Sequence, residues 1–257
     1  MTTDSPHRTA LITGGAIRVG AAMAQAMAAD GWHVAIHYHG STKEAGALLA
    51  RIQADGGQGH LVQADLRDAD AVAGLIAAAG RDAPPLGCLI NNASLFENDA
   101  ALNMTLNSWD DHQAVNLRAP VFLARDFARN LDNETSGVVV NLLDNKVFAL
   151  NPDFFSYTIA KYGLLGATKV LAMELAPRVR VCGIAPGITL PSTNQSEQGF
   201  QTAHALNPLG QGSTLEQLVA ALRFILAAPA LTGEVITIDG GQSLLGLPRD
   251  VAFLTEM

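Results

Sequence analysis

Short apolar runs alternate with longer alanine-rich segments along most of this chain. The runs have the length of strands and are Thr9–Thr13, Val34–Tyr38, His60–Gln63, Cys88–Ile90, Val138–Leu143, Val179–Ile184 and Val235–Ile238. The segments between them have the length of helices and include Ala16–Asp30, Lys43–Ala54, Ala69–Ala79, Asp110–Leu131, Phe155–Leu175 and Leu215–Ala227. Such alternation is typical of βαβ units, and near-continuous apolar strands suit a sheet that is covered on both faces. The pattern predicts an α/β fold: a single-domain, doubly wound Rossmann fold over residues 1–257, with a seven-stranded parallel sheet.

The least regular part of the chain is the stretch of about 187–212, which is rich in Pro, Ser, Thr, Asn and Gln. A long loop in a compact domain usually has a function, often as a lid over a site. We therefore interpret 187–212 as a substrate loop, with a tolerated surface insertion as the alternative.

Composition narrows the class of protein. Apolar residues make up 49% of the chain and charged residues 16%, which is enough for a large core. The net charge of −8 argues against a nucleic-acid surface, which needs a basic stripe. Cys88 and Cys182 lie in apolar runs and lack metal-site spacing, so we expect buried, reduced thiols and no metal. The polar start of the chain and the lack of an apolar run of roughly 20 residues indicate no signal peptide and no membrane span, so we expect a cytoplasmic protein.

The first strand runs into a glycine-rich turn, Thr13-Gly14-Gly15-Ala16-Ile17-Arg18-Val19-Gly20, that opens a helix. Backbone N–H groups and the positive end of the helix dipole meet there, and glycine lets a ligand approach the backbone closely. Placed at the start of the first βαβ unit, the turn predicts a pyrophosphate site, whereas a plain strand-to-helix turn is the alternative.

The end of the second strand indicates which dinucleotide binds. NAD-binding proteins usually carry an acidic residue here to hydrogen-bond the ribose 2′-hydroxyl, but this chain has Ile36-His37-Tyr38-His39-Gly40-Ser41-Thr42-Lys43. His39, Ser41 and Lys43 offer hydroxyl and cationic donors that suit a 2′-phosphate, and Arg18 is long enough to help. We predict NADP(H) as the cofactor.

Tyr157 and Lys161 lie four residues apart at the start of a predicted helix, so their side chains share one face. A nearby ammonium favours phenolate and is expected to lower the tyrosine pKa from its free value of about 10, which allows proton exchange near neutral pH. Lys161 could also hold the nicotinamide ribose. Thirteen residues before Tyr157, at the end of the fifth strand, lies Asp144.

These motifs together resemble the short-chain dehydrogenase/reductase family, from Thr9 to about Gly241. The turn is similar to its TGxxxGxG pattern, and Arg18 at the middle glycine is similar to the pteridine reductases. The segment His37-Tyr38-His39-Gly40-Ser41 resembles the HYHRS-like segment of those enzymes, with Gly40 where they often have arginine.

The resemblance implies further cofactor contacts. Asp65, followed by Leu66, resembles the adenine-contacting aspartate, although it could instead cap the next helix. Asn91-Asn92-Ala93-Ser94 resembles the NNAG element that lines the channel near the nicotinamide ribose. Pro186-Gly187 resembles the family's PG turn, after which Ile188 and Thr189 would contact the carboxamide. The predicted cofactor-binding residues are Thr13, Gly14, Arg18, Val19, Gly20, His37, Tyr38, His39, Ser41, Asp65, Leu66, Asn92, Ala93, Ser94, Tyr157, Lys161, Pro186, Gly187 and Ile188.

The resemblance also implies catalytic roles. Most family members have serine where this chain has Asp144, whereas pteridine reductases similarly carry aspartate. Reducing a C=N bond needs a hydride at carbon and a proton at nitrogen. An Asp–Tyr–Lys group can supply the proton. Asn116 resembles the asparagine that supports a water chain to the lysine, with a buried structural asparagine as the alternative. Phe96 is a candidate to stack on a flat heterocycle, although a plain core phenylalanine is nearly as good an interpretation.

We therefore predict an NADPH-dependent reductase of a pteridine-like substrate, with Asp144, Tyr157, Lys161 and Asn116 as catalytic residues. Arg18, Ser94, Phe96, Asp144 and Tyr157 are the predicted substrate contacts. The alternatives are a reductase of another small ketone or alcohol, because one fold hosts many reactions, and a non-catalytic NADP(H) sensor. The resemblance implies a homotetramer that is formed through helices such as Asp110–Leu131 and Phe155–Leu175.

Overall fold

The computed structural model describes residues 8–132, 134–191 and 196–255. Within them lies one parallel sheet of seven strands in the order β3-β2-β1-β4-β5-β6-β7. The strands are β1 (Thr9–Ile12), β2 (His33–Tyr38), β3 (Gln58–Gln63), β4 (Leu86–Asn91), β5 (Gly137–Leu142), β6 (Val179–Pro186) and β7 (Val235–Ile238). The predicted doubly wound fold and its strands are confirmed, with strand ends that differ by no more than two residues.

The order reverses direction between β1 and β4, because β1 pairs with β2 on one side and with β4 on the other. Ligands of open α/β sheets bind beyond the carboxyl ends of the strands at such a switch point. The topology therefore directs the search for a site to the loops after β1, β4 and β5.

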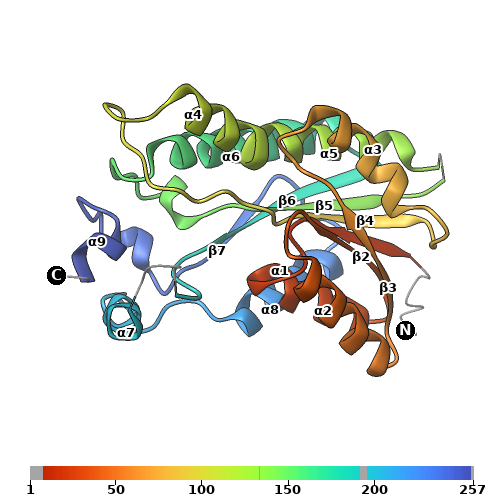
Figure 1. Ribbon diagram of the computed structural model, residues 1–257, viewed down its shortest axis with the longest axis horizontal. Helices are drawn as coiled ribbons and strands as arrows, with labels where there is room; N and C mark the ends of the chain where they lie inside the picture. Colours follow the sequence, from red (N-terminus) through yellow and green to blue (C-terminus); the bar gives the residue numbers. More distant parts are fainter. Residues whose placement is uncertain (1–7, 133, 192–195, 256–257) are drawn as a thin grey trace.

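Helices cover both faces of the sheet (Figure 1). On one face lie α1 (Arg18–Ala29), α2 (Thr42–Ala54) and α8 (Leu215–Ala227). On the other lie α3 (Ala69–Ala79), α4 (Leu106–Gln113), α5 (Ala119–Asn130) and α6 (Phe155–Leu175). The short helices α7 (Glu197–Ala205) and α9 (Val251–Thr255) lie side by side at one end of the molecule (Figure 1).

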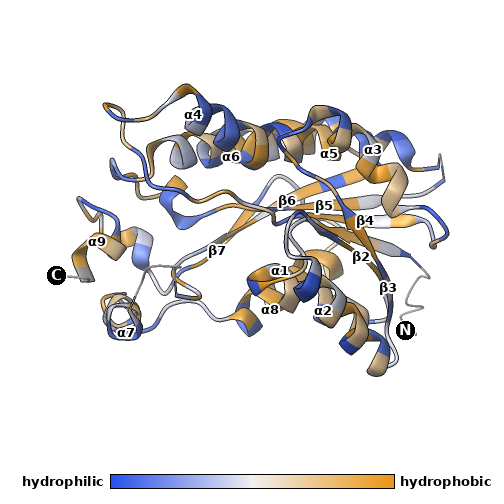
Figure 2. Cartoon of the chain, viewed as in Figure 1, coloured by the Kyte–Doolittle hydropathy of each residue, from blue (hydrophilic) through white to orange (hydrophobic). Residues whose placement is uncertain are grey.

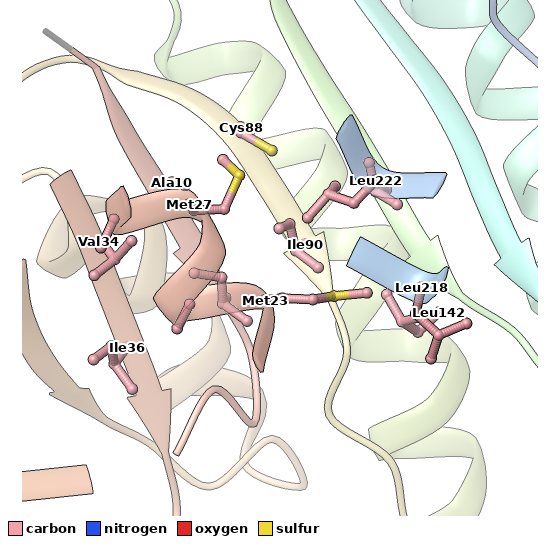
Figure 3. Close-up of a cluster of buried hydrophobic side chains, with 14 of the residues drawn as sticks. Ala10, Met23, Met27, Val34, Ile36, Cys88, Ile90, Leu142, Leu218 and Leu222 are labelled. Atoms are coloured by element: carbon pink, nitrogen blue, oxygen red, sulfur yellow. The ribbon is translucent and has the colours of Figure 1, made fainter. Parts of the chain in front are cut away.

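Alternation along the strands divides the core into two layers. Ala10 and Ile12 point to the α1 and α8 face, whereas Leu11 between them points to the other. Figure 3 shows the first layer, where side chains of α1 and α8 meet the strands: Met23, Met27, Leu218 and Leu222 against Ala10, Val34, Ile36, Cys88, Ile90 and Leu142. Figure 2 colours the chain by hydropathy: the central strands are mostly apolar, whereas the helices on both faces carry apolar and polar residues. Both cysteines are buried and free.

Two predicted segments differ from the structure. The predicted helix Asp110–Leu131 begins earlier, at Leu106, because the Thr105 hydroxyl accepts a hydrogen bond from the Ser108 N–H at 3.1 Å and caps α4. It is then interrupted by a π-helical turn, Ala114–Arg118, before α5.

The predicted loop 187–212 contains α7, whose first turn is capped by Ser196. The polar composition of this segment did not indicate a helix, because α7 buries only Gly199 and Ala203. Residues 192–195 of this loop lie outside the described residues. No helix in the described part of the chain is long and apolar enough to cross a bilayer.

Candidate active site

The glycine-rich turn after β1 is tied to the end of β4. The Thr13 hydroxyl accepts hydrogen bonds from the N–H groups of Asn92 and Ala93, each at 3.0 Å. The Asn92 amide in turn donates to the carbonyls of Thr13 and Gly14, at 2.9 and 3.0 Å. Thr13, Asn92 and Ala93 thus shape the turn from within.

Glycine is needed in this turn for close packing. Gly14 has a φ of +59°, a left-handed conformation that side chains disfavour. A Cβ on Gly20 would collide with the Gly14 carbonyl oxygen and lie 2.5 Å from the Asn92 amide nitrogen. The first turn of α1 therefore packs directly on the loop, and in the described residues no side chain caps that helix. Its N–H groups are available to an anion.

Arg18 begins α1 with a φ of +54°, a left-handed conformation that favours glycine. Its exposed guanidinium donates to the carbonyl oxygen of Pro191 at 2.9 Å. Arg18 thus connects the glycine-rich turn to the loop after β6.

His37 contributes no free donor to this region. Its Nδ1 accepts the N–H of Gly14 at 3.0 Å, so Nε2 carries the proton and pairs with the Ala64 carbonyl at 3.2 Å. Burial lowers the pKa of His37 to about 4, and the ring stays neutral. Both ring nitrogens of His37 are hydrogen-bonded within the protein, so this side chain supports the turn. No polar atom of the side chain is left for the predicted contact with the cofactor. Tyr38 and Leu66 likewise pack into the core layers.

The ends of β2 and β3 form a separate, open part of the site. The His39 ring is exposed, and its Nε2 lies 3.9 Å from the Asp65 carboxylate. Hydrogen bonds from Arg67 lower the pKa of Asp65 to about 2. The cap of α3 is Asp68, so the alternative interpretation of Asp65 as that cap is wrong. Within the described residues, the Ser41 hydroxyl makes no capping hydrogen bond at the start of α2.

Asp144 and Tyr157 are in direct contact beyond the end of β5. The Tyr157 hydroxyl donates to Asp144 Oδ2 at 2.7 Å, and the Lys146 N–H donates to Asp144 Oδ1 at 2.8 Å. Burial raises the pKa of Asp144 and outweighs these hydrogen bonds. The prediction that the Tyr157 pKa is lowered is wrong: burial, then the charge of Asp144, raises it well above its usual value.

Lys161 lies one helical turn after Tyr157 and is fully buried. Its Nζ donates to the Leu142 carbonyl at 2.7 Å and lies 5.7 Å from the centre of the Tyr157 ring. Burial lowers the pKa of Lys161 to about 8. The Lys161 ammonium therefore loses its proton more readily than that of a free lysine, and its hydrogen bond goes to the Leu142 carbonyl. The charged neighbour that hydrogen-bonds the Tyr157 hydroxyl and shifts its pKa is Asp144.

Asn116 lies in the π-helical turn and is also buried. Its side chain exchanges two hydrogen bonds with the backbone of Leu95, at 2.9 and 2.8 Å. This contact fixes the segment that carries Ser94 and Phe96, which fits the structural alternative for Asn116, and the role in a water chain to Lys161 stays a prediction.

A cavity of about 290 Å³ joins half of the predicted site residues. Among its lining residues are Arg18, Val19, Asn92, Ser94, Phe96, Asp144, Tyr157, Lys161, Pro186, Gly187 and Ile188. The half-exposed Phe96 ring meets Tyr157 edge-on at 4.7 Å between centroids. The predicted site residues that do not line this cavity are Thr13, Gly14, Gly20, His37, Tyr38, His39, Ser41, Asp65, Leu66, Ala93 and Asn116.

The sequence reasoning missed two groups of residues. Asn98 and Asp99, in the loop after β4, accept the first N–H groups of α6 and so place Tyr157. Lys146, Gln242, Arg249 and Asp250 line the cavity but belong to no motif. The pairing of Lys146 with Asp250 joins segments that are far apart in the chain. No sequence signal marks such a contact. In the described ranges, no three His, Cys, Asp or Glu side chains group closely enough to hold a metal ion.

A doubly wound fold of the dinucleotide-binding type, with a buried aspartate, tyrosine and lysine around one cavity, defines an oxidoreductase of the α/β class. The family model for short chain dehydrogenases matches residues 8–202, and the chain belongs to that family.

The similar proteins differ in substrate. A 3-oxoacyl-[acyl-carrier-protein] reductase of Synechocystis sp. is 31% identical over 91% of this chain and 96% of its own length. A probable galactose dehydrogenase of Rhizobium meliloti is 32% identical over 93% of this chain and 96% of its own. The crystal structure of the FolM alternative dihydrofolate reductase 1 of Brucella suis, a complex with NADP, has a TM-score of 0.89 and 42% identity, with 92% of this chain and 95% of that chain covered.

Proposed function

We propose that this protein is an NADPH-dependent reductase that converts a dihydropterin to a tetrahydropterin. The observation that carries the proposal is the 2.7 Å hydrogen bond between the buried Tyr157 hydroxyl and the Asp144 carboxylate, at the floor of a cavity that Phe96 also lines. Its support comes from the cofactor cradle, the proton chemistry and the shape of the cavity.

The residues present fit a nicotinamide dinucleotide phosphate. The cradle at Gly14 and Gly20 would be filled by a Cβ, and the uncapped start of α1 leaves N–H groups for phosphate. His39, Ser41 and Lys43 at the start of α2 would hold the 2′-phosphate, and Lys161 would hold the nicotinamide ribose. When bound, the cofactor supplies a hydride to the substrate.

Asp144 and Tyr157 supply the proton. Burial raises the pKa of both groups, so Tyr157 keeps its proton near neutral pH and the Asp144 carboxyl holds a proton more readily than a free one. The nitrogen of a C=N bond takes the Tyr157 proton as the carbon accepts hydride, and the Asp144 carboxyl group can relay a replacement proton to Tyr157. A carboxyl group, which can take up and release a proton, is better suited to this relay than a neutral serine hydroxyl.

The proposed substrate class rests on the shape of the cavity and on the similarity of the chain to a dihydrofolate reductase. Phe96 presents a half-exposed ring on which a flat heterocycle can stack, and Ser94 and Arg18 supply polar contacts at the same cavity. The 42% identity with the Brucella suis dihydrofolate reductase exceeds the 31% identity with the Synechocystis 3-oxoacyl reductase.

A second candidate is a carbonyl reductase. The likeness to the Synechocystis 3-oxoacyl reductase over 91% of this chain favours it. A tyrosine acid with a nearby lysine serves a ketone as well as an imine, so the two candidates differ mainly in the need for Asp144.

We also propose that four copies assemble through α5 and α6. The outer faces of these helices expose large apolar side chains: Phe122, Ile159, Val170 and Met173. Exposed apolar side chains gathered on neighbouring helices are typical of subunit interfaces.

Following NADPH oxidation tests the function. We expect turnover with dihydrobiopterin, dihydromonapterin and dihydrofolate, and little with a panel of ketones and a 3-oxoacyl thioester. Rapid turnover of the ketones or the thioester with inert pterins would contradict the pteridine proposal and establish the carbonyl candidate. Tight NADPH binding with no turnover of either panel would leave only a sensor.

A further inference from the structure

The C-terminal segment, residues 247–255, folds back over the cavity. Leu247, Arg249 and Asp250 line it together with Val251 and Ala252 at the start of α9. Figure 1 shows α9 beside α7, away from the layers that cover the sheet. The motifs of the sequence end before this segment, so nothing assigns it a role.

Two ion pairs hold the segment in place. Lys146 Nζ lies 2.9 Å from Asp250 Oδ2, with only 6% and 14% of the two side chains exposed. Asp153 accepts the Asp250 N–H at 2.7 Å and the Arg249 Nε at 2.8 Å. The backbone at Arg249 is thus anchored, and the position of its guanidinium is restricted.

Four cations line the cavity in the described part of the chain: Arg18, Lys146, Lys161 and Arg249. Lys161 donates to the Leu142 carbonyl, Lys146 pairs with Asp250, and Arg18 donates to the carbonyls of residues 190 and 191. Arg249 uses only Nε, for Asp153, and within the described residues its two terminal nitrogens have no hydrogen-bond partner.

Arg249 lies on the outer side of the cavity. Its side chain is 52% exposed, whereas Tyr157 at the floor is 4% exposed. Stacked rings connect the two: Phe96 contacts Tyr157 and stacks on Phe154 at 4.1 Å, Phe154 stacks on Phe253 at 5.8 Å, and the Arg249 guanidinium lies 5.1 Å from the Phe253 ring centre. These contacts fix the guanidinium relative to the reacting hydroxyl.

We propose that Arg249 is a specificity-determining residue that binds the carboxylate of a substrate tail leading out of the cavity. The proposal rests on the proposed pteridine reduction and adds a substrate class to it: a reduced pterin with an aryl tail that ends in a carboxylate, as in folates. The free guanidinium edge matches the two oxygens of a carboxylate.

The charges around Arg249 limit how strongly it can bind a substrate carboxylate. Asp153 already neutralises part of the Arg249 charge, and the group is half exposed to water. An exposed ion pair contributes up to about 1 kcal/mol, which corresponds to roughly fivefold in binding. We therefore expect a preference of roughly three- to fivefold rather than an absolute requirement.

Kinetics with two probes test the proposal: dihydrofolate, with an anionic tail, and dihydrobiopterin, with a neutral one. We expect Arg249→Gln to lower the ratio of kcat/KM for dihydrofolate over dihydrobiopterin by roughly three- to fivefold, mostly through KM for dihydrofolate. Arg249→Lys should keep part of the preference. Arg129→Gln removes an arginine of α5 that is more exposed than Arg249, at 73% against 52%, and should leave the ratio unchanged.

A wild-type measurement covers the case in which the variants do not fold. Added salt should lower kcat/KM for dihydrofolate more than for dihydrobiopterin, because it screens the pairing of Arg249 with the tail. A ratio that is equal in wild type and Arg249→Gln, or insensitive to salt, would overturn the role of Arg249 while pteridine reduction stands. Wild-type enzyme that turns over neither probe would overturn both proposals.

Discussion

At the scale of single residues, Asp144 decides the chemistry that Tyr157 can perform. The carboxylate accepts the tyrosine hydrogen bond at 2.7 Å and helps to raise the Tyr157 pKa. Sequence reasoning identified Tyr157 and Lys161 from their spacing, and the role of Asp144 from the family resemblance. It could not predict the direction of the Tyr157 pKa, because burial and the choice between two charged neighbours are set by the tertiary structure.

Lys161 should give the pH profile an alkaline limb. Its pKa is lowered to about 8, so the ammonium is present below that pH and lost above it. We expect kcat/KM for a dihydropterin, which reports the free enzyme, to fall as pH rises through about 8. In Lys161→Arg the group stays charged, so this limb should disappear even if activity is lower. An identical limb in Lys161→Arg would contradict the assignment.

Gly40 offers a gain-of-affinity test at the 2′-phosphate end. No atom lies within 4 Å of the position that a Cβ would take, so an arginine fits there. We expect Gly40→Arg to tighten NADPH binding by roughly three- to fivefold without affecting NADH, as measured by fluorescence titration. Gly74→Arg on α3 adds the same charge at an equally open position and serves as the control. Equal effects of Gly40→Arg on both cofactors would contradict this placement.

At the scale of elements, the site depends on how α1 and α6 begin. The start of α1 was predictable from its glycines, whereas the docking of α6 was not. Its first N–H groups donate to Asn98 and Asp99, to which sequence reasoning gave no role. The interruption of the long helix by a π-helical turn at Asn116 also left no sequence signal, because its residues have ordinary helical propensities apart from the asparagine.

Two glycine-to-alanine substitutions separate the contribution of steric packing to stability from that of backbone conformational freedom. In Gly20→Ala the new Cβ meets the Gly14 backbone, so we expect a loss of about 1–3 kcal/mol in the free energy of unfolding and weakened NADPH binding. In Gly46→Ala the Cβ enters open space on α2, and we expect a gain of about 0.5–1 kcal/mol. Denaturant unfolding measures both changes. Equal stabilities for Gly20→Ala and wild type would show that α1 does not pack on the turn as described.

At the scale of the whole molecule, the alternation of strands and helices was enough to predict the seven-stranded sheet. Strand burial and the crossover rules leave few other arrangements for such a pattern. The C-terminal segment was not predictable, because its position depends on ion pairs such as that of Lys146 with Asp250, which are 104 residues apart.

Assembly can be tested at the same scale. We expect the wild-type protein to sediment as four chains, because α5 and α6 expose apolar side chains that a monomer would leave in water. Substituting aspartate for Val170 and Met173, which are 59% and 73% exposed, should split the assembly with little change in far-UV circular dichroism. A monomeric wild type would contradict the proposed assembly.

The central claim is that Asp144 and Tyr157 together protonate a pteridine nitrogen as hydride arrives. Single-turnover oxidation of bound NADPH by dihydrobiopterin tests it in wild type, Asp144→Ser and Tyr157→Phe. We predict turnover in wild type and a loss of at least about a hundredfold in both variants, with NADPH affinity retained. Wild-type activity that survives in Asp144→Ser would contradict the role of the carboxylate, and an inert wild type with bound NADPH would contradict pteridine reduction itself.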